Sequence, residues 1–235
     1  MSLMTGGFLV TRGSAPMCGR FTLVSPFAVI AERFHVSVPP DLRPRFNIAP
    51  GQDVLCIVRD GQKRLEPLRW GLIPSWARDP AIGSRMINAR AETLAEKPGF
   101  RNAFARRRCL VAADGFFEWR PAGRRKEPVY IFLKSKKPFG FAGLYESWHG
   151  PDGREIRTCT IITTGANDLV RPIHDRMPVI LHECVEDAWL DPSETDLERL
   201  RSLLGPFPSD EMDAYGVSPA VNNASHDAPD CIRPV

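Results

Sequence analysis

A cysteine directly after a methionine, in the stretch Met17-Cys18-Gly19-Arg20, has the type and place to do chemistry. If Met17 initiates the working protein and is removed, Cys18 carries a free α-amine beside its thiol, with ordinary pKa values of about 8 and about 8.5. The amine would attack an aldehyde to form an imine, and the nearby thiol would then close a thiazolidine ring on the same carbon. An internal Cys18 is instead expected to be a small buried hydrophobe.

Two further side chains could give such a nucleophile acid–base support. Glu118, in the stretch GFFEW, is either an exposed strand carboxylate paired with an arginine, or a desolvated acid whose raised pKa suits proton transfer. His174, in the stretch IHDRM, is either a loop residue held by Asp175 or a backbone carbonyl, or a group that moves protons near neutral pH.

Two polar residues and three bulky ones could bind a substrate. Asn88 and Arg90, in INARAE, either cap a helix or hold a phosphate or a reacting sugar. Trp70, Pro74 and Trp76, in RWGLIPSW, are expected in the core. If they are exposed beside arginines, they form a platform on which the bases of a single strand stack.

The composition is typical of a globular protein: 235 residues, 43% hydrophobic and 25% charged. The net charge of +3 is too small to indicate a nucleic-acid partner by itself. Basic residues nevertheless cluster at 106–108, 124–126 and 134–137, where they could attract phosphate or simply form a solvated face. No two of the six cysteines form a CxxC motif, so we expect free thiols and no metal site.

The sequence shows neither a membrane-spanning segment nor a secretory signal, and both observations bear on the cellular location of the protein. No run approaches the ~18 apolar residues needed to span a bilayer. Residues 1–16 lack the apolar centre of a secretory signal, and we expect them to be a leader, a tag or a misplaced start outside the fold. A cytoplasmic protein without a membrane partner is therefore expected.

The elements that position these residues are mainly strands. Ser25 and Pro26 favour an N-capped helix near 26–34 with Phe27, Ile30 and Phe34 on one face, and further helices are expected near 98–107 and 194–204. Strand patterns cover residues 19–24, 53–60, 64–72, 109–120, 127–134, 139–150 and 154–164. Residues 38–52 are expected to be a proline-rich connection, and residues 205–235 a loop-dominated closing segment with His226 at the surface. The fold class is α+β: a single domain of residues 17–235, with curled antiparallel β-sheets forming an open barrel-like core and peripheral helices.

Six ordered motifs, MCGRF, RFNIAPGQ, RWGLIPSW, INARAET, RCLVAADGFFEW and HDRMPVIL, run from Met17 to about Leu181. Together they resemble the SOS-response-associated peptidase (SRAP) family, whose members process abasic sites in DNA. The resemblance implies that the methionine is removed and that the new N-terminal cysteine links to the ring-opened abasic sugar in single-stranded DNA through a thiazolidine. It also implies that no metal and no organic cofactor is needed.

Carried over to this sequence, the resemblance implies four catalytic residues. Cys18 is the crosslinking nucleophile, Asn88 orients it and the sugar, Glu118 is the acid–base catalyst, and His174 assists ring opening and the reverse reaction. The positions expected to contact DNA or line the site are Arg20, Asn47, Pro50, Trp70, Pro74, Trp76, Arg90, Thr163 and Arg176. Phe117 departs from the family pattern, where tyrosine is frequent.

Several alternatives stay open from the sequence. Retained residues 1–17 would block the Cys18 amine, and autocatalytic cleavage of the Met17–Cys18 bond with Glu118 is one way to expose it. Rival functions are a cysteine peptidase that uses Cys18 and His174 on peptides, and a non-catalytic module that binds single-stranded DNA. For the leading function we expect a monomer in the DNA damage (SOS) response that is nucleoid-associated when bound to DNA.

Overall fold

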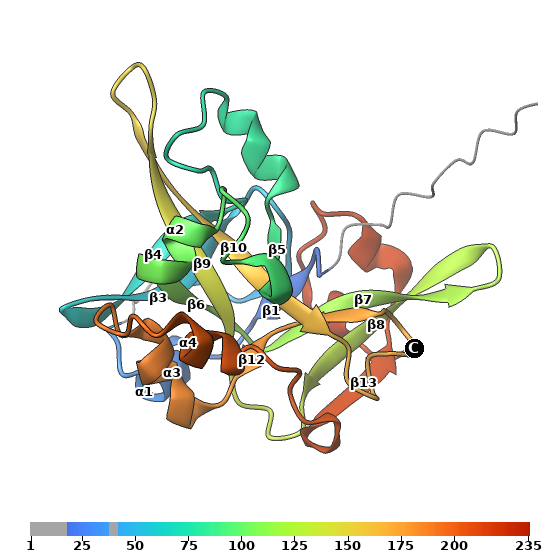
Figure 1. Ribbon diagram of the computed structural model, residues 1–235. Helices are drawn as coiled ribbons and strands as arrows, with labels where there is room; N and C mark the ends of the chain where they lie inside the picture. The colour runs from blue at the N-terminus through green and yellow to red at the C-terminus, as the bar shows by residue number, and fades with distance from the viewer. Residues whose placement is uncertain (1–17, 38–41) are drawn as a thin grey trace, which may run out of the picture.

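Two β-sheets form the body of the molecule in the computed structural model, which describes residues 18–37 and 42–235 (Figure 1). The first sheet has the strand order β13-β8-β7-β1-β2, and its neighbouring strands are antiparallel. Its members are β1 (Phe21–Leu23), β2 (Arg45–Ile48), β7 (Gly115–Ala122), β8 (Arg125–Leu133) and β13 (Met212–Gly216). The prediction that residues 1–16 form a leader lies outside the described residues.

The second sheet closes on itself. Its order is β11-β10-β4-β3-β6-β9-β12, and a further antiparallel pairing of β9 with β10 joins β3, β4, β6, β9 and β10 into a ring of five strands. The bounds are β3 (Asp53–Asp60), β4 (Gln62–Trp70), β5 (Asn88–Arg90), β6 (Arg108–Ala113), β9 (Phe139–His149), β10 (Glu155–Gly165), β11 (Arg176–Pro178) and β12 (Ile180–Leu181). The α+β class with a barrel-like core is thus confirmed, and the barrel is closed. Parallel pairings of β10 with β4 and with β5 were not predicted.

The predicted continuous strand over residues 109–120 is wrong, because the chain changes sheets at Asp114. The Asp114 carboxylate accepts hydrogen bonds from the backbone N–H groups of Val24 and Ser25 and from the Ser25 hydroxyl. It ties the turn after β1 to the junction between β6 in the barrel and β7 in the first sheet. Ser25 is therefore not the helix N-cap that the sequence suggested, and Pro26 takes that position.

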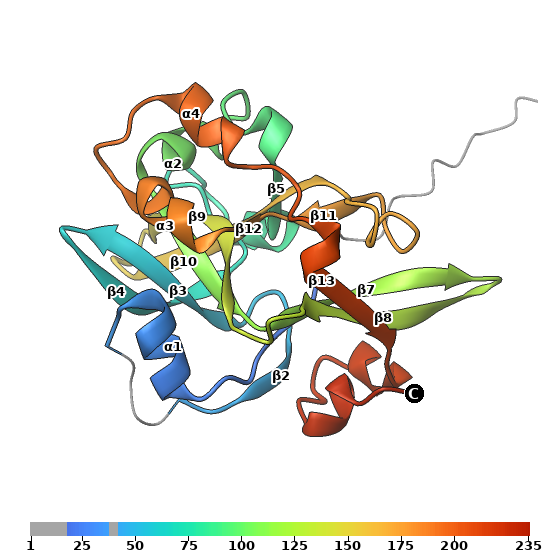
Figure 2. The same ribbon diagram turned by 90° about the horizontal axis from the view of Figure 1, so that it is seen from below.

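The helices lie at the periphery of the sheets (Figure 2). The predicted helices correspond to α1 (Phe27–Phe34), α2 (Arg101–Arg106) and α4 (Leu197–Ser202), whereas α3 (Glu183–Leu190) was not predicted. On α1, Phe27, Ile30 and Phe34 share one face as predicted, but only Ile30 and Phe34 are buried, and Phe27 in the first turn is 45% exposed. Short 3₁₀ helices are η1 (Pro80–Arg85), η2 (Ala91–Thr93), η3 (Ser209–Glu211), η4 (Pro219–Asn222) and η5 (Pro229–Ile232).

Two segments expected to be loops contain regular structure. Residues 45–48 of the proline-rich connection form β2, and β13 of the closing segment extends the first sheet by pairing with β8. The part of that connection at residues 38–41 lies outside the described residues. Within the described ranges, the structure contains no helix with the length and apolar character required to cross a membrane.

Candidate active site

Cys18 lies just before β1 and is completely buried. Its backbone nitrogen donates a hydrogen bond to Oε1 of Glu118 across 2.8 Å. Its φ of 37° is in the left-handed region, which a residue with a Cβ adopts only at a cost. The start of the described chain is therefore held in a strained conformation against one carboxylate.

Glu118 is buried on β7, with 2% of its surface exposed. Of the two alternatives from the sequence, the desolvated acid is the one observed, since no arginine pairs with this carboxylate in the described chain. Burial raises the pKa of Glu118 to about 7, and the charge of Asp175 adds to that rise. The hydrogen bond from Cys18 and the charge of Lys126 oppose it. Both protonation states are consequently present near neutral pH.

The Cys18 thiol shares this environment. Burial, and then the negative charge of Glu118, raise the pKa of the thiol well above its usual value. A thiol in this position keeps its proton at neutral pH and is not a ready thiolate nucleophile.

His174 lies in the loop between β10 and β11. Its Nδ1 accepts a hydrogen bond from the backbone N–H of Arg176 at 3.1 Å and lies 2.9 Å from Oδ1 of Asp175. Both contacts use Nδ1, and Nε2 makes no hydrogen bond to any residue that the structure describes. Because Asp175 also acts on the pKa of Glu118, this loop and the Cys18–Glu118 pair belong to one electrostatic environment.

Strand β5 carries Asn88 and Arg90 alongside β10. The parallel register pairs Asn88 with Ile161 and Arg90 with Thr163. Both residues lie in a strand, and Arg90 takes the N-cap position of η2 without a side-chain cap bond, so the predicted side-chain cap is not observed at Arg90.

Arg176 joins β11 to the same region. Its guanidinium donates to the carboxylate of Glu92 at 2.6 and 2.9 Å and to the carbonyl of Thr163 at 2.7 Å. Thr163 itself is fully buried, so it supports the guanidinium and does not offer a surface for DNA as predicted. Sequence reasoning missed Glu92, since nothing local links it to a residue so far away in the chain.

Trp70 connects the start of β1 to β5. The Phe21 ring packs edge-on against the Trp70 ring with centroids 5.2 Å apart, and Trp70 Nε1 donates to the carbonyl of Ile87, the neighbour of Asn88. At 1% exposure, Trp70 is the core residue that the sequence favoured, and it offers no surface on which DNA bases could stack. It sets the distance between the Cys18 segment and the Asn88 strand.

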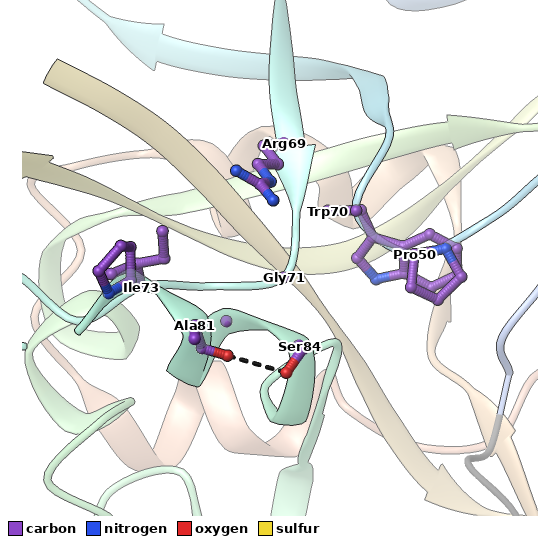
Figure 3. A pocket seen from close by; sticks show the side chains of 10 residues that line it. Pro50, Arg69, Trp70, Gly71, Ile73, Ala81 and Ser84 are labelled. Atoms are coloured by element: carbon purple, nitrogen blue, oxygen red, sulfur yellow. Dashed lines mark hydrogen bonds between the residues drawn. The ribbon is translucent and has the colours of Figure 1, made fainter. Parts of the chain in front are cut away.

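A pocket of about 150 Å³ opens beside Trp70. Figure 3 shows Pro50 and Trp70 next to each other on one side, with Arg69 above the pocket. Ser84, which donates to the carbonyl of Ala81 at 2.8 Å, lies below the pocket, across from Arg69, and Ile73 lies on the side opposite Trp70. Trp70 therefore forms one side of a pocket in addition to its role in the core.

The other apolar residues expected to contact DNA or line the site differ in how exposed they are. Pro50 is exposed, and Trp76 is 58% exposed, so both offer an apolar surface to a ligand. Pro74 is buried, as the core prediction required, so it does not contact DNA directly. Of the three RWGLIPSW residues named from the sequence, only Trp76 is an open stacking surface.

Arg20 and Asn47 hold the C-terminal segment. Arg20 donates to Oδ1 of Asn47 at 3.0 Å and to the carbonyl of Val221 at 2.6 Å. Asn47 is fully buried, and its amide donates to the carbonyls of Val221, Asn223 and His226. The prediction that Asn47 contacts DNA is therefore corrected to a structural role.

His226 is partly exposed and pairs with Asp230, with Nε2 and Oδ1 2.9 Å apart. Ligand atoms of His226, Asp230 and Cys231 lie within 4.8 Å of one another. The ion pair and the bond from the Cys231 thiol to the His226 carbonyl already account for this arrangement.

Comparison with known proteins decides the family. The model of the SOS response associated peptidase (SRAP) family matches residues 17–224. The chain belongs to this family. The resemblance inferred from the six motifs is confirmed.

Relatives of this SRAP chain cover nearly all of it. It is 51% identical over 222 residues to the abasic site processing protein YoqW of Bacillus subtilis (strain 168), covering 92% of this chain and 99% of that protein. Its identity to the abasic site processing protein YedK of Escherichia coli (strain K12) is 32%, with coverage of 93% and 100%. The crystal structure of a protein from Bacteroides thetaiotaomicron has a TM-score of 0.85 at 30% identity, covering 93% of this chain and 100% of that one.

Proposed function

We propose that this SRAP protein processes abasic sites in single-stranded DNA. Once the residues before Cys18 are removed, Cys18 forms a thiazolidine with the aldehyde of the ring-opened abasic sugar. The 2.8 Å contact between the Cys18 nitrogen and the Glu118 carboxylate carries the proposal. That nitrogen becomes the α-amine, so the acid–base group already lies beside the atom that attacks. The names of YoqW and YedK as abasic site processing proteins support the substrate.

The chemistry balances without an added reagent. The α-amine of Cys18 adds to the aldehyde carbon and gives a carbinolamine. Glu118 in its acid form donates a proton to the carbinolamine hydroxyl, which leaves as water, and an iminium ion that keeps one N–H remains. The Cys18 sulfur then adds to the iminium carbon, and the thiol proton passes to the Glu118 carboxylate, which restores its acid form. One water is released and nothing is oxidised or reduced, so the reaction needs no metal and no cofactor.

The pKa values fit this order of events. A Glu118 pKa of about 7 lets the same group give a proton in one step and take one in the next. The raised pKa of the Cys18 thiol keeps its proton in place until the imine is formed, so the sulfur adds after the amine. His174 is proposed to protonate the sugar oxygen during ring opening through Nε2, and Asn88 to orient the sugar.

Exposed groups near these residues are proposed to bind the strand. Arg90 is exposed beside Asn88, whereas Arg176 is partly buried and is held in place by Glu92. Pro50 and Trp76 supply apolar surfaces on which bases stack. We propose a monomer that acts in the DNA damage response, because no part of this chemistry requires a second subunit.

The same contact favours autocatalytic removal of the preceding residues. In the uncleaved chain the Cys18 nitrogen belongs to the Met17–Cys18 peptide bond, and Glu118 in its acid form lies where it can protonate that nitrogen as it leaves. A water molecule supplies the new carboxylate of residue 17. Intact mass of the purified full chain over time tests this, and a mass that never loses residues 1–17 contradicts it.

A matched pair of variants tests the crosslinking step. With Cys18 as the first residue, the protein is expected to form a heat-stable adduct with single-stranded DNA that carries one abasic site. Cys18→Ser keeps the α-amine and loses the thiol, so it is expected to form only an imine that borohydride traps. A stable adduct from Cys18→Ser without reduction would contradict the thiazolidine.

A further inference from the structure

In two of the three basic clusters, two residues each are engaged within the protein. Arg107 pairs with Glu146 at 2.7 Å, and buried Arg108 donates to five backbone carbonyls. At the far end of β8, Lys134 donates to the carbonyl of Asp210, and the Lys136 ammonium lies 3.2 Å from the centroid of the Phe132 ring. These charges serve the fold.

The third cluster is different. Arg124, Arg125 and Lys126 are exposed at the turn between β7 and β8, where Gly123 has a φ of 61°. None of the three makes an ion pair or a side-chain hydrogen bond with any part of the chain that the structure describes. The neighbouring Arg120 pairs with Glu127 across the hairpin. The tip therefore presents three unneutralised positive charges to solvent.

This hairpin extends from the active site into solvent. Figures 1 and 2 both show the β7–β8 hairpin projecting beyond the rest of the sheet. Glu118 lies on β7 and pairs with Val129, while Ala122 pairs with Arg125 at the tip. A strand rises about 3.3 Å per residue, so the tip is on the order of 13–17 Å from Glu118 along the strand. The charge of Lys126 lowers the pKa of Glu118, so this cation lies within electrostatic range of the site.

We propose that Arg124, Arg125 and Lys126 bind phosphates of the DNA strand that flanks the abasic site. The inference rests on the proposed function, because it places the lesion at Cys18. Phosphates of one duplex strand rise about 3.4 Å per nucleotide along the helix axis, and an extended single strand spaces them further apart, so the tip would reach phosphates at most about four or five nucleotides from the lesion. An arginine guanidinium can donate two parallel hydrogen bonds to two oxygens of one phosphate, and two of the three residues are arginines.

Salt dependence of binding tests the hairpin directly. The double variant Arg124→Gln/Arg125→Gln is compared with Lys134→Gln/Lys137→Gln, which removes the same charge from the other end of β8. The ligand is a single strand with an abasic analogue that has no aldehyde, so the full chain can be used and no crosslink forms. Equal melting temperatures show that the three proteins are folded alike.

Loss of two phosphate contacts is expected to make the plot of log K against log salt shallower by about 1.4 for a single strand. The Lys134/Lys137 control is expected to keep the wild-type slope. Cutting the strand back to the lesion on one side is expected to abolish the difference between wild type and hairpin variant. Equal slopes for wild type and hairpin variant, or an equal change in the control, would overturn the proposal.

The outcome is independent of the crosslinking chemistry. A shallower slope in the hairpin variant with no adduct on aldehyde-bearing DNA would support the hairpin contact and reject the thiazolidine. An adduct on aldehyde-bearing DNA, together with equal salt slopes for wild type and hairpin variant, would support the crosslink and reject the hairpin contact.

Discussion

The burial of Glu118 predicts that the Glu118→Gln variant is more stable than the wild type at alkaline pH. The glutamine has the same shape, and its amide oxygen still accepts the hydrogen bond from the Cys18 nitrogen. What it removes is the cost of holding a charge in a site that is 2% exposed. The variant therefore changes the stability of the protein and the proton transfer by residue 118 in opposite directions, so the two effects can be measured separately.

The magnitude follows from the pKa of Glu118, which burial raises from 4.5 to about 7. Below pH 4.5 the carboxyl is protonated in both the folded and the unfolded chain, and it contributes no pH dependence. Between 4.5 and about 7 the folded state holds a proton that the unfolded state has released, so the stability of the wild type falls as pH rises. Each pKa unit is worth about 1.4 kcal/mol, so the wild type loses about 3 kcal/mol by pH 8.

Urea unfolding of the full chain and of Glu118→Gln at pH 4.5 and pH 8 measures this effect. The difference in free energy of unfolding is expected to move by about 3 kcal/mol in favour of the variant at the higher pH. Meanwhile the rate of adduct formation by the form that begins at Cys18 is expected to fall about 10²–10⁴-fold. A stability difference that does not change with pH would refute the buried, proton-binding Glu118.

Three further predictions follow from single residues. Lys126→Gln removes a charge that lowers the pKa of Glu118, so the pH profile of adduct formation is expected to move to higher pH; an unmoved profile contradicts that influence. Arg108→Lys leaves buried carbonyls without donors and should lower the free energy of unfolding by about 2–4 kcal/mol in urea; a loss below about 0.5 kcal/mol contradicts it. Trp76→Ala should weaken binding of single-stranded DNA in a fluorescence titration without lowering the melting temperature, whereas Trp70→Ala should cost about 3–5 kcal/mol of stability.

The strands were largely predictable because their apolar residues are local in sequence. The run over residues 53–60 coincides with β3, for which alternation and the turn at Gly61 are sufficient signals. The break at Asp114 was not predictable, because its partners Val24 and Ser25 come from a distant segment. Helix α3 was missed because its sequence follows directly on a strand-like apolar run.

The site was predictable in its residue types but not in their surroundings. The GFFEW motif indicated a candidate acid in Glu118, yet only the folded structure places the Cys18 nitrogen against it. Asn47 and Thr163 look like surface polar groups in the sequence, but strand pairing and the C-terminal segment bury them. Closure of the barrel through β4 and β10 depends on contacts between segments far apart in the chain, which local patterns do not encode.

Intact mass of the DNA adduct tests whether a free Cys18 amine is required for crosslinking. The protein with Cys18 as its first residue, and the full chain kept uncleaved, are each incubated with single-stranded DNA that carries one abasic site. An adduct is expected from the first protein alone, with the summed mass of protein and DNA less one water. No adduct from folded protein with a free Cys18 amine, or an equal yield from the uncleaved chain, would contradict it.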